Sequence, residues 1–336
     1  MSGDPHVEQS GEDRLIAEYF RPLAKHPGAF ALMDDAAVIT PPAGCDIVLK
    51  TDGIIGGVHF FPDDPPDLVG KKALRVNLSD LAAKAARPLG FLLTLALPEE
   101  VADAWLAPFA RGLGDDAEFF GCPLFGGDTD RTPGPITISI AMFGAVPHGK
   151  MLRRAGAQPG DRVVVTGTIG DAALGVALRR DPRLTGRWGL SAEQGNMLQG
   201  RYLLPQPRTN VAEIFGRYTS AAMDISDGLA GDLAKLCQAS GVAAEVHAAR
   251  VPLSQAAGTA LERDPSLMEA VLTGGDDYEI LAAVPANKLE ALRSEAAAKG
   301  VAVTEIGMIQ AGDGRARVLD RHGNPLAFAR PSFSHF

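Results

Sequence analysis

The chain has 336 residues, about the length of two domains, and its 46% hydrophobic content is enough to build substantial cores. Its 41 acidic and 32 basic side chains give a formal net charge of −9, without a run of Lys or Arg. This acidic balance argues against nucleic acid or an anionic membrane as a partner, so any phosphate ligand would be bound with the help of metal cations.

Three cysteines, Cys45, Cys122 and Cys237, are widely spaced and form no CxxC pair. Their spacing argues against a zinc site or a disulfide framework, and it fits a reducing compartment in which each cysteine serves as ordinary packing. The polar residues 1–11 predict a disordered N-terminus without a signal peptide, and no apolar run reaches the roughly 18 residues of a membrane span. We therefore expect a soluble, cytoplasmic protein.

Residues 12–149 are expected to form the first domain. Helices are expected where apolar residues recur at the helical period, and strands in short apolar runs bounded by Gly or Pro. In chain order we expect a helix at 12–25, strands at 33–40 and 47–52, a helix at 67–86, a strand at 91–97, a helix at 101–120, a Gly-Gly-Asp corner within 124–130 and a strand at 136–146.

A stretch rich in Gly, Pro and Arg at 147–160 predicts the boundary to a second domain, which takes residues 150–336. Here strands and helices alternate, which is typical of a layered α/β fold. We expect strands at 162–165, 243–247, 278–284 and 301–305, and helices at 171–178, 191–203, 209–217, from Gly228 to about Leu236, and at 286–299.

Acidic residues recur at the ends of apolar runs or behind Gly-Gly pairs, where loops form sites and a ligand can approach the backbone closely. These corners are Asp34-Asp35, Thr51-Asp52, Asp80, Asp128 with Asp130, Asp224 with Asp227, and Asp276-Asp277. Carboxylates gathered in one cleft repel unless cations neutralise them, and Asp and Thr oxygens favour Mg²⁺ or Mn²⁺ over zinc. Each Mg²⁺ takes few protein carboxylates, so the number of corners implies several ions.

The stretch 222–232 places two Asp and one Ser at a strand-to-helix corner, which suits Mg²⁺ and phosphate together. A plain helix N-cap is equally compatible with these residues. On the expected helix 67–86, Asn77, Asp80 and Lys84 form a polar stripe. We interpret the stripe as part of a site rather than as a solvated face, because the rest of the helix is apolar.

Two further features have a functional and a plain interpretation. Arg153-Arg154 could clamp a phosphate or belong to a solvated linker, and 167–170 (Gly-Thr-Ile-Gly) fits a plain turn better than a phosphate loop. The chain has no Walker A motif, no HRD/DFG set of a protein kinase and no GxSxG elbow.

With these corners in place, the chain resembles the thiamine-monophosphate kinases, a family of the ATP-binding superfamily that includes aminoimidazole ribonucleotide synthetase. The resemblance runs from about residue 12 to the C-terminus. It is carried by Asp34–Ala37, Lys50–Gly53, Gly57–Phe60, Lys72–Leu74, Val76–Ala83, Gly126–Thr129, Arg154–Ala157, Pro159–Asp161, Met223–Leu229 and Gly274–Glu279.

The resemblance implies a two-domain α/β fold of the synthetase-like kinase type, whose N-terminal domain pairs with its copy in a homodimer and forms a shared β barrel. It implies transfer of the γ-phosphate of ATP to thiamine monophosphate, which gives thiamine diphosphate, with several Mg²⁺ ions. The alternatives are another ATP-dependent synthetase of the superfamily, and a non-catalytic regulator that binds Mg²⁺ and nucleotide.

Residue by residue, the resemblance implies three sets. The metal ligands would be Asp35, Thr51, Asp52, Asp80, Asp128, Asp224 and Asp227. The ATP contacts would be Gly127, Asp128, Arg154 and Ser226, and the substrate contacts would be His59, Asp276 and Phe333. The chain departs from the family at Lys50, where a small hydroxyl residue is frequent, and at Asp276, where Glu is usual; Phe333 is placed only by its tail context.

No general base is expected at this site. A phosphate monoester has a second pKa of about 6, so the acceptor is already mostly ionised at neutral pH. Asp52 and Asp128 would then act electrostatically, and we interpret His59 as a phosphate or loop contact, with an ordinary surface residue as its alternative.

Overall fold

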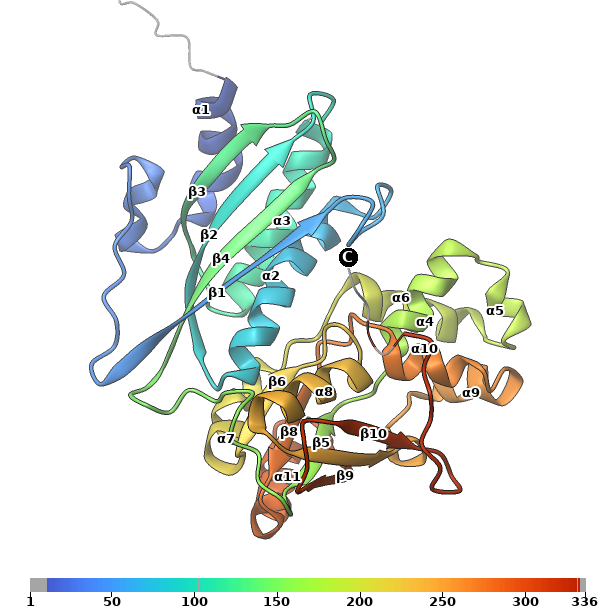
Figure 1. Ribbon diagram of the computed structural model, residues 1–336. Coiled ribbons are helices and arrows are strands. Elements are labelled where there is room, and N and C mark those ends of the chain that lie inside the picture. The colour runs from blue at the N-terminus through green and yellow to red at the C-terminus, as the bar shows by residue number, and fades with distance from the viewer. Residues whose placement is uncertain (1–10, 102, 331, 333–336) are drawn as a thin grey trace, which may run out of the picture. The chain divides into compact units, whose positions relative to one another are not determined.

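The structure, a computed structural model, describes residues 11–101, 103–330 and 332 (Figure 1). Phe333 and all but Gly11 of the segment expected to be disordered lie outside these residues. The chain folds as two compact units. The first takes the chain up to Ala43 with Leu49–Asn77 and Pro88–Gly144, and the second takes Gly44–Val48, Leu78–Arg87 and the chain from Ala145.

The first unit is built on a four-stranded sheet in the order β1-β4-β2-β3, in which β2 and β3 run parallel. Its strands are β1 (Cys45–Ile55), β2 (Arg87–Leu97), β3 (Leu124–Arg131) and β4 (Thr137–Pro147). The helices α2 (Pro66–Ala83) and α3 (Asp103–Phe119) lie along this sheet (Figure 1). Leu93 and Leu95 on β2 are buried, whereas Thr94 between them is exposed, so one sheet face is covered and the other is open.

Three expectations for this unit need correction. The helix expected at 12–25 is split into α1 (Gly11–Leu15), a π-helical turn (Ile16–Phe20) and a 3₁₀ turn (Arg21–Leu23), because Pro22 cannot donate a backbone hydrogen bond. A 3₁₀ segment, Pro27–Leu32, follows. The strand expected at 33–40 is wrong, since 33–40 has no regular structure. The Gly-Gly-Asp corner at 124–130 is instead the strand β3.

The second unit is built on a six-stranded sheet in the order β10-β7-β9-β5-β8-β6. β10 and β7 are parallel, and the other neighbouring pairs are antiparallel. The strands are β5 (Arg162–Thr166), β6 (Ala221–Asp224), β7 (Ala243–His247), β8 (Ile280–Val284), β9 (Val303–Gln310) and β10 (Ala316–Leu319).

Both faces of this sheet are covered, which explains why its central strands read as continuous apolar runs. Val163 and Val165 of β5 enter a core with α8 (Leu229–Ser240), whereas Val164 enters a core with α7 (Ala212–Tyr218) and α11 (Leu289–Ala297). Short 3₁₀ turns at Thr209–Val211, Ala248–Arg250 and Ala286–Lys288 precede or join these elements.

A third core gathers helices around Trp188. The helices are α4 (Asp171–Arg180), α5 (Leu184–Arg187), α6 (Ala192–Leu203), α9 (Gln255–Arg263) and α10 (Leu267–Thr273). A capping box of Ser191 and Gln194 begins α6. In the described part of the chain, no helix is both long and apolar enough to cross a membrane.

The buried cysteines behave as expected for packing residues. Burial raises the pKa of the Cys122 thiol to about 12 and that of Cys237 to about 11, so both remain protonated at neutral pH.

Candidate active site

Two of the acidic corners of the second unit are joined through their backbones. The N–H of Asp276 donates to the carbonyl of Ser226 at 2.9 Å, and the N–H of Tyr278 donates to Ile225 at 2.8 Å. In return, the N–H of Ile225 donates to the carbonyl of Glu279 at 2.9 Å. A Cβ atom at Gly275 would lie 2.2 Å from the Ser226 carbonyl oxygen, so glycine is required for this approach. The Asp224–Gly228 and Gly274–Glu279 segments therefore form one structural element.

Asp224 stands at the end of β6 and is 3% exposed. One of its carboxylate oxygens accepts a hydrogen bond from the hydroxyl of Ser79 at 2.8 Å. Ser79 directly precedes Asp80 on α2, so this bond holds the helical turn that carries Asp80 next to Asp224. The structure thus brings together three of the corners expected to be functional, those of Asp80, Asp224 and Asp276.

The loop with Ser226 and Asp227 is held by Asp232, a residue to which the sequence assigned no role. Its carboxylate accepts the backbone N–H groups of Ser226 at 3.1 Å and Asp227 at 3.0 Å. The side chain is fully buried in the first turn of α8, and this burial raises the pKa of Asp232. Lys235 donates to both Asp232, at 2.8 Å, and Asp227. A lysine ammonium therefore lies against the Asp227 carboxylate, where a cation is expected.

In the first unit, Asp52 is paired with Lys50, whose Nζ lies 3.1 Å from Oδ2 of Asp52. The backbone N–H of Asp52 donates to the side-chain oxygen of Asn77 at 2.9 Å. Thr51 is exposed and Asp52 is half-buried, because successive side chains on a strand point to opposite faces. The cation at position 50 thus neutralises the neighbouring carboxylate, which a small hydroxyl residue would not do.

Asp128 lies on β3 opposite Thr94 of β2, and both side chains are exposed. Its Oδ1 accepts the N–H of Thr129 at 3.0 Å. A Cβ atom at Gly127 would lie only 1.8 Å from the carbonyl oxygen of Leu93, so this glycine is imposed by the close approach of β2 and β3. Asp35 is also exposed.

The polar stripe of α2 is not a solvated face. Asn77 is 1% exposed, and besides accepting from Asp52 it donates to the carbonyl of Ala73 at 3.0 Å. Lys84, which directly follows α2, donates from Nζ to the carbonyl of Ala222 at 2.8 Å, and this bond ties it to β6. Both residues therefore fix backbone beside predicted ligands.

His59 lies in a loop held at both ends. Its Nδ1 accepts the N–H of Ile55 at 3.0 Å, and its carbonyl accepts from Nζ of Lys72 at 3.0 Å. With Nδ1 as acceptor, a neutral ring carries its proton on Nε2, which is a donor suited to a phosphate oxygen. The side chain of Arg154 is exposed, and its carbonyl accepts from the hydroxyl of Ser240 at 2.9 Å.

Asp276 and Tyr278 adopt left-handed backbone conformations, with φ of 69° and 50°. Such conformations cost about 1–3 kcal/mol each in residues other than glycine and are concentrated at functional sites. The hydroxyl of Tyr278 donates to Oδ1 of Asp276 at 3.2 Å, which orients this carboxylate. The two strained residues are therefore Asp276, a predicted substrate contact, and Tyr278, which donates a hydrogen bond to it.

The donor set fits Mg²⁺, because it consists of carboxylate and hydroxyl oxygens without thiolates. Within 11–101 and 103–330, no group of three or more His, Cys, Asp or Glu side chains is arranged to hold a metal ion by itself. Mg²⁺ binds one or two carboxylates and completes its shell with water and substrate phosphates, so such a group is not required.

Comparison with known proteins identifies the two halves of the chain. Residues 33–146 match the AIR synthase related protein, N-terminal domain, and residues 158–320 match the AIR synthase related protein, C-terminal domain. The thiamine-monophosphate kinase of Caulobacter vibrioides is 42% identical over 89% of this chain and 84% of the relative. That of Escherichia coli K12 is 37% identical over 97% of this chain and 98% of the relative.

Solved structures agree with these relatives. The thiamine-monophosphate kinase of Stenotrophomonas maltophilia has a TM-score of 0.80 at 35% identity, and the match covers 94% of this chain and 96% of the other. AaThiL, solved in complex with AMPPCP and TMP, has a TM-score of 0.76 at 30% identity, covering 92% and 97%. A hydrogenase maturation protein HypE has a TM-score of 0.77 at only 18% identity, a likeness of fold alone. By its two domains and its identity to relatives over most of its length, this chain belongs to the thiamine-monophosphate kinase family.

Proposed function

We propose that the chain transfers the γ-phosphate of ATP to the phosphate of thiamine monophosphate and so forms thiamine diphosphate and ADP. The observation that carries this proposal is the likeness to AaThiL, which was solved with AMPPCP and TMP and matches 92% of this chain at 30% identity. The joined corners of Asp224–Gly228 and Gly274–Glu279 support it, because they bring candidate ligands for both phosphorylated molecules into one element.

In this proposal the two units contribute separate groups of metal ligands. The first unit supplies Asp35, Thr51, Asp52 and Asp128, and the second supplies Asp80, Asp224 and Asp227. When bound, Mg²⁺ would neutralise the phosphates and hold the attacking and leaving oxygens in line. Gly127, Asp128, Arg154 and Ser226 bind ATP, and His59, Asp276 and Phe333 bind the acceptor.

The chain's own residues bind and orient, and none is required as a general base. The acceptor phosphate is already ionised, with a second pKa of about 6. The Nε2–H of His59 donates to one of its oxygens, and Asp232 keeps the N–H groups of Ser226 and Asp227 in a fixed orientation. Lys235 balances the charge of Asp227, one of the carboxylates that would hold a metal ion.

We also propose that the enzyme is a homodimer. On the open face of the first sheet, Leu49 of β1 is 71% exposed and Ile47 is 38% exposed. Two large apolar side chains on one uncovered strand face favour burial against a second copy.

The activity is tested by incubating the purified protein with ATP, Mg²⁺ and thiamine monophosphate and separating the products by chromatography. We expect thiamine diphosphate and ADP in equal amounts, and neither product when EDTA removes the metal. ATP hydrolysis without thiamine diphosphate would indicate another synthetase of the superfamily, and nucleotide binding without turnover would indicate a regulator.

Asp128→Asn tests the prediction that Asp128 holds a metal ion. Asp130→Asn is its control two residues along the same strand, because Asp130 is also exposed and belongs to the same acidic corner but is not among the predicted ligands. We expect Asp128→Asn to lower kcat by about 100-fold or more, since charge stabilisation of this kind contributes 10²–10³. Asp130→Asn should stay within twofold of the wild type. Equal turnover in the two variants, measured at limiting Mg²⁺, would contradict the proposed role of Asp128.

A further inference from the structure

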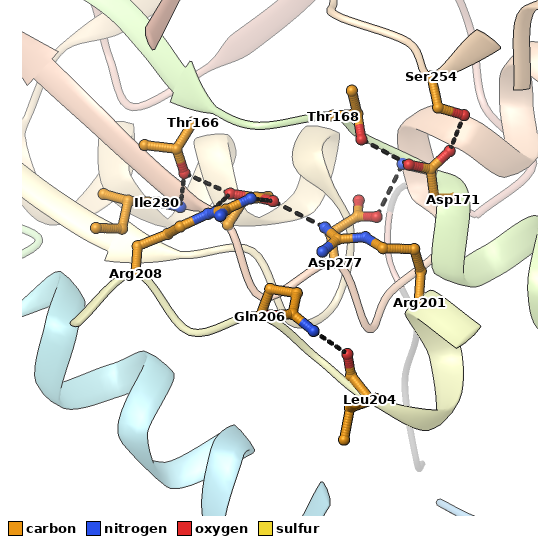
Figure 2. A network of polar contacts seen from close by, with 12 residues as sticks. Thr166, Thr168, Asp171, Arg201, Leu204, Gln206, Arg208, Ser254, Asp277 and Ile280 are labelled. Carbon is orange, nitrogen blue, oxygen red and sulfur yellow. Dashed lines mark hydrogen bonds and ion pairs between the residues drawn. The ribbon is translucent and has the colours of Figure 1, made fainter. Parts of the chain in front are cut away.

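Glu279, which directly precedes β8, is a fully buried carboxylate with four donors. Arg201 donates from Nη2 at 2.8 Å, Arg208 donates from Nε at 2.6 Å and also from Nη2, and the Thr166 hydroxyl donates at 2.6 Å (Figure 2). The same Thr166 hydroxyl accepts the N–H of Ile280 at 2.8 Å. Both oxygens of Glu279 are therefore fixed by charged and neutral donors from three separate segments of the unit.

The turn at Gly167–Gly170 wraps around this carboxylate and around that of Asp277. A Cβ atom at Gly167, where φ is +57°, would lie 2.2 Å from Oε1 of Glu279. The N–H of Gly170 donates to Oδ1 of Asp277 at 2.8 Å (Figure 2). The turn therefore binds carboxylates of its own chain, which agrees with a plain turn and leaves the Gly170 amide unavailable to a phosphate.

The strained backbone lies between these anchors. Asp276 and Tyr278 are left-handed, and Asp277 and Glu279 are held on either side of Tyr278 by Gly170 and by the two arginines. The carbonyl of Glu279 also accepts the N–H of Ile225, next to Ser226. The buried network thus fixes the one segment that carries Asp276 and is joined to the metal-binding corner.

We propose that Glu279, clamped by Arg201, Arg208 and Thr166, is a positioning residue that holds Asp276 in its left-handed conformation for binding the acceptor. This inference rests on the proposed function for the identity of the acceptor. Glu279 does not touch the substrate; it acts through the backbone of the Asp276–Tyr278 turn. If Glu279 contributed only to packing, its substitution would lower stability without changing KM for the acceptor.

The test compares two variants, in each of which an amide replaces a buried carboxylate that is paired with arginine. Glu279→Gln leaves the shape of the side chain intact but removes an acceptor from the clamp. Asp116→Asn does the same to the pair with Arg75 in the first unit, where Nε lies 2.5 Å from Oδ2 and the side chains are 10% and 4% exposed. We expect Glu279→Gln to raise KM for thiamine monophosphate about tenfold with KM for ATP within twofold, and Asp116→Asn to change neither.

A second pair of variants, at Thr166, tests the same proposal if Glu279→Gln does not fold. Thr166→Val removes one donor, and Thr166→Ser retains it. We expect the valine variant to raise KM for the acceptor at least threefold and the serine variant to match the wild type. Equal values in both would overturn the proposal, because the serine variant keeps the hydroxyl that donates to Glu279 and the valine variant lacks it.

A readout independent of activity is hydrogen–deuterium exchange of the peptide that covers 274–279. Its amides should exchange at least tenfold faster in Glu279→Gln than in the wild type, with no change in Asp116→Asn. Unchanged exchange and unchanged KM in Glu279→Gln would overturn the positioning role. Absence of thiamine diphosphate formation by the wild type would refute the proposed function instead, and exchange would still decide whether Glu279 holds the turn.

Discussion

At the scale of single residues, Asp277 stands out because its Oδ2 is buried without a hydrogen-bond partner. Burial raises the pKa of Asp277 well above its ordinary value, and the nearby charges of Asp171 and Glu279 raise it further, against the opposing bond from Gly170. The folded state thus keeps this proton at pH values where the unfolded chain, with a pKa of about 3.9, has lost it.

The stability of the wild type should therefore fall as pH rises from about 4 towards the raised pKa, by up to about 1.4 kcal/mol per pH unit from this group. Asp277→Asn removes the titration and can still accept from Gly170. We expect the free energy of unfolding of the variant, relative to the wild type, to increase between pH 5 and pH 8 in urea titrations. The control Asp181→Asn should give a constant difference, since the pKa of Asp181 is lowered by its bond to Arg183 and lies below this range.

The residues that point into a site could be predicted more readily than the residues that hold them. Asp224 and Asp276 follow apolar or Gly-Gly runs, which local patterns reveal. Glu279 acts through partners such as Arg201, 78 positions away. Asp232 instead holds the backbone N–H groups of Ser226 and Asp227, only six and five positions before it. For both carboxylates, the available signal was an acidic residue within an otherwise apolar stretch expected to be a helix or strand. The partners of Glu279 could not be predicted, because they depend on tertiary packing, which periodicity does not encode.

At the scale of elements, strands buried on both faces and long helices were predicted, since β5, β8 and α2 have strong apolar patterns. The short helices α5, α9 and α10 and the edge strand β10 were missed, because their stability comes from packing on the rest of the unit rather than from local sequence. At 33–40 a strand was predicted that does not form. Tertiary packing decides here too, since an apolar run without a partner strand does not join a sheet.

The Gly167–Gly170 turn gives the prediction for this scale. Gly167→Ala forces a left-handed conformation on alanine and places its Cβ 2.2 Å from Oε1 of Glu279. We expect a loss of about 2–4 kcal/mol in unfolding free energy, from backbone strain and overpacking together. Gly258→Ala is the control: it lies in α9 with no atom within 4 Å of its Cβ position, and it should be neutral or stabilising by up to about 1 kcal/mol. Urea unfolding followed by circular dichroism measures both, and equal values would contradict the close packing of this turn.

At the scale of the whole molecule, the two AIR synthase related domains explain why the acidic corners are spread along the chain: each compact unit carries its own set. It was not predicted from the sequence that β1 of the first unit carries large apolar side chains on its uncovered face. Alternation along β1 leaves Ile47 and Leu49 exposed while Val48 is buried, and exposed apolar side chains of this kind favour burial against a partner.

The proposed homodimer follows from that face and can be tested on it. Leu49→Glu places a charge at the centre of the exposed β1 face, and a buried unpaired charge is far more costly than the apolar contact that it replaces. We expect the wild type to sediment as a dimer and Leu49→Glu as a monomer at micromolar concentration. Phe119→Glu is the control, since Phe119 is 78% exposed but lies at the end of α3, away from this strand face, and the variant should remain dimeric. A dimer that persists in Leu49→Glu, or dissociates equally in Phe119→Glu, would show that the open sheet face is not the interface.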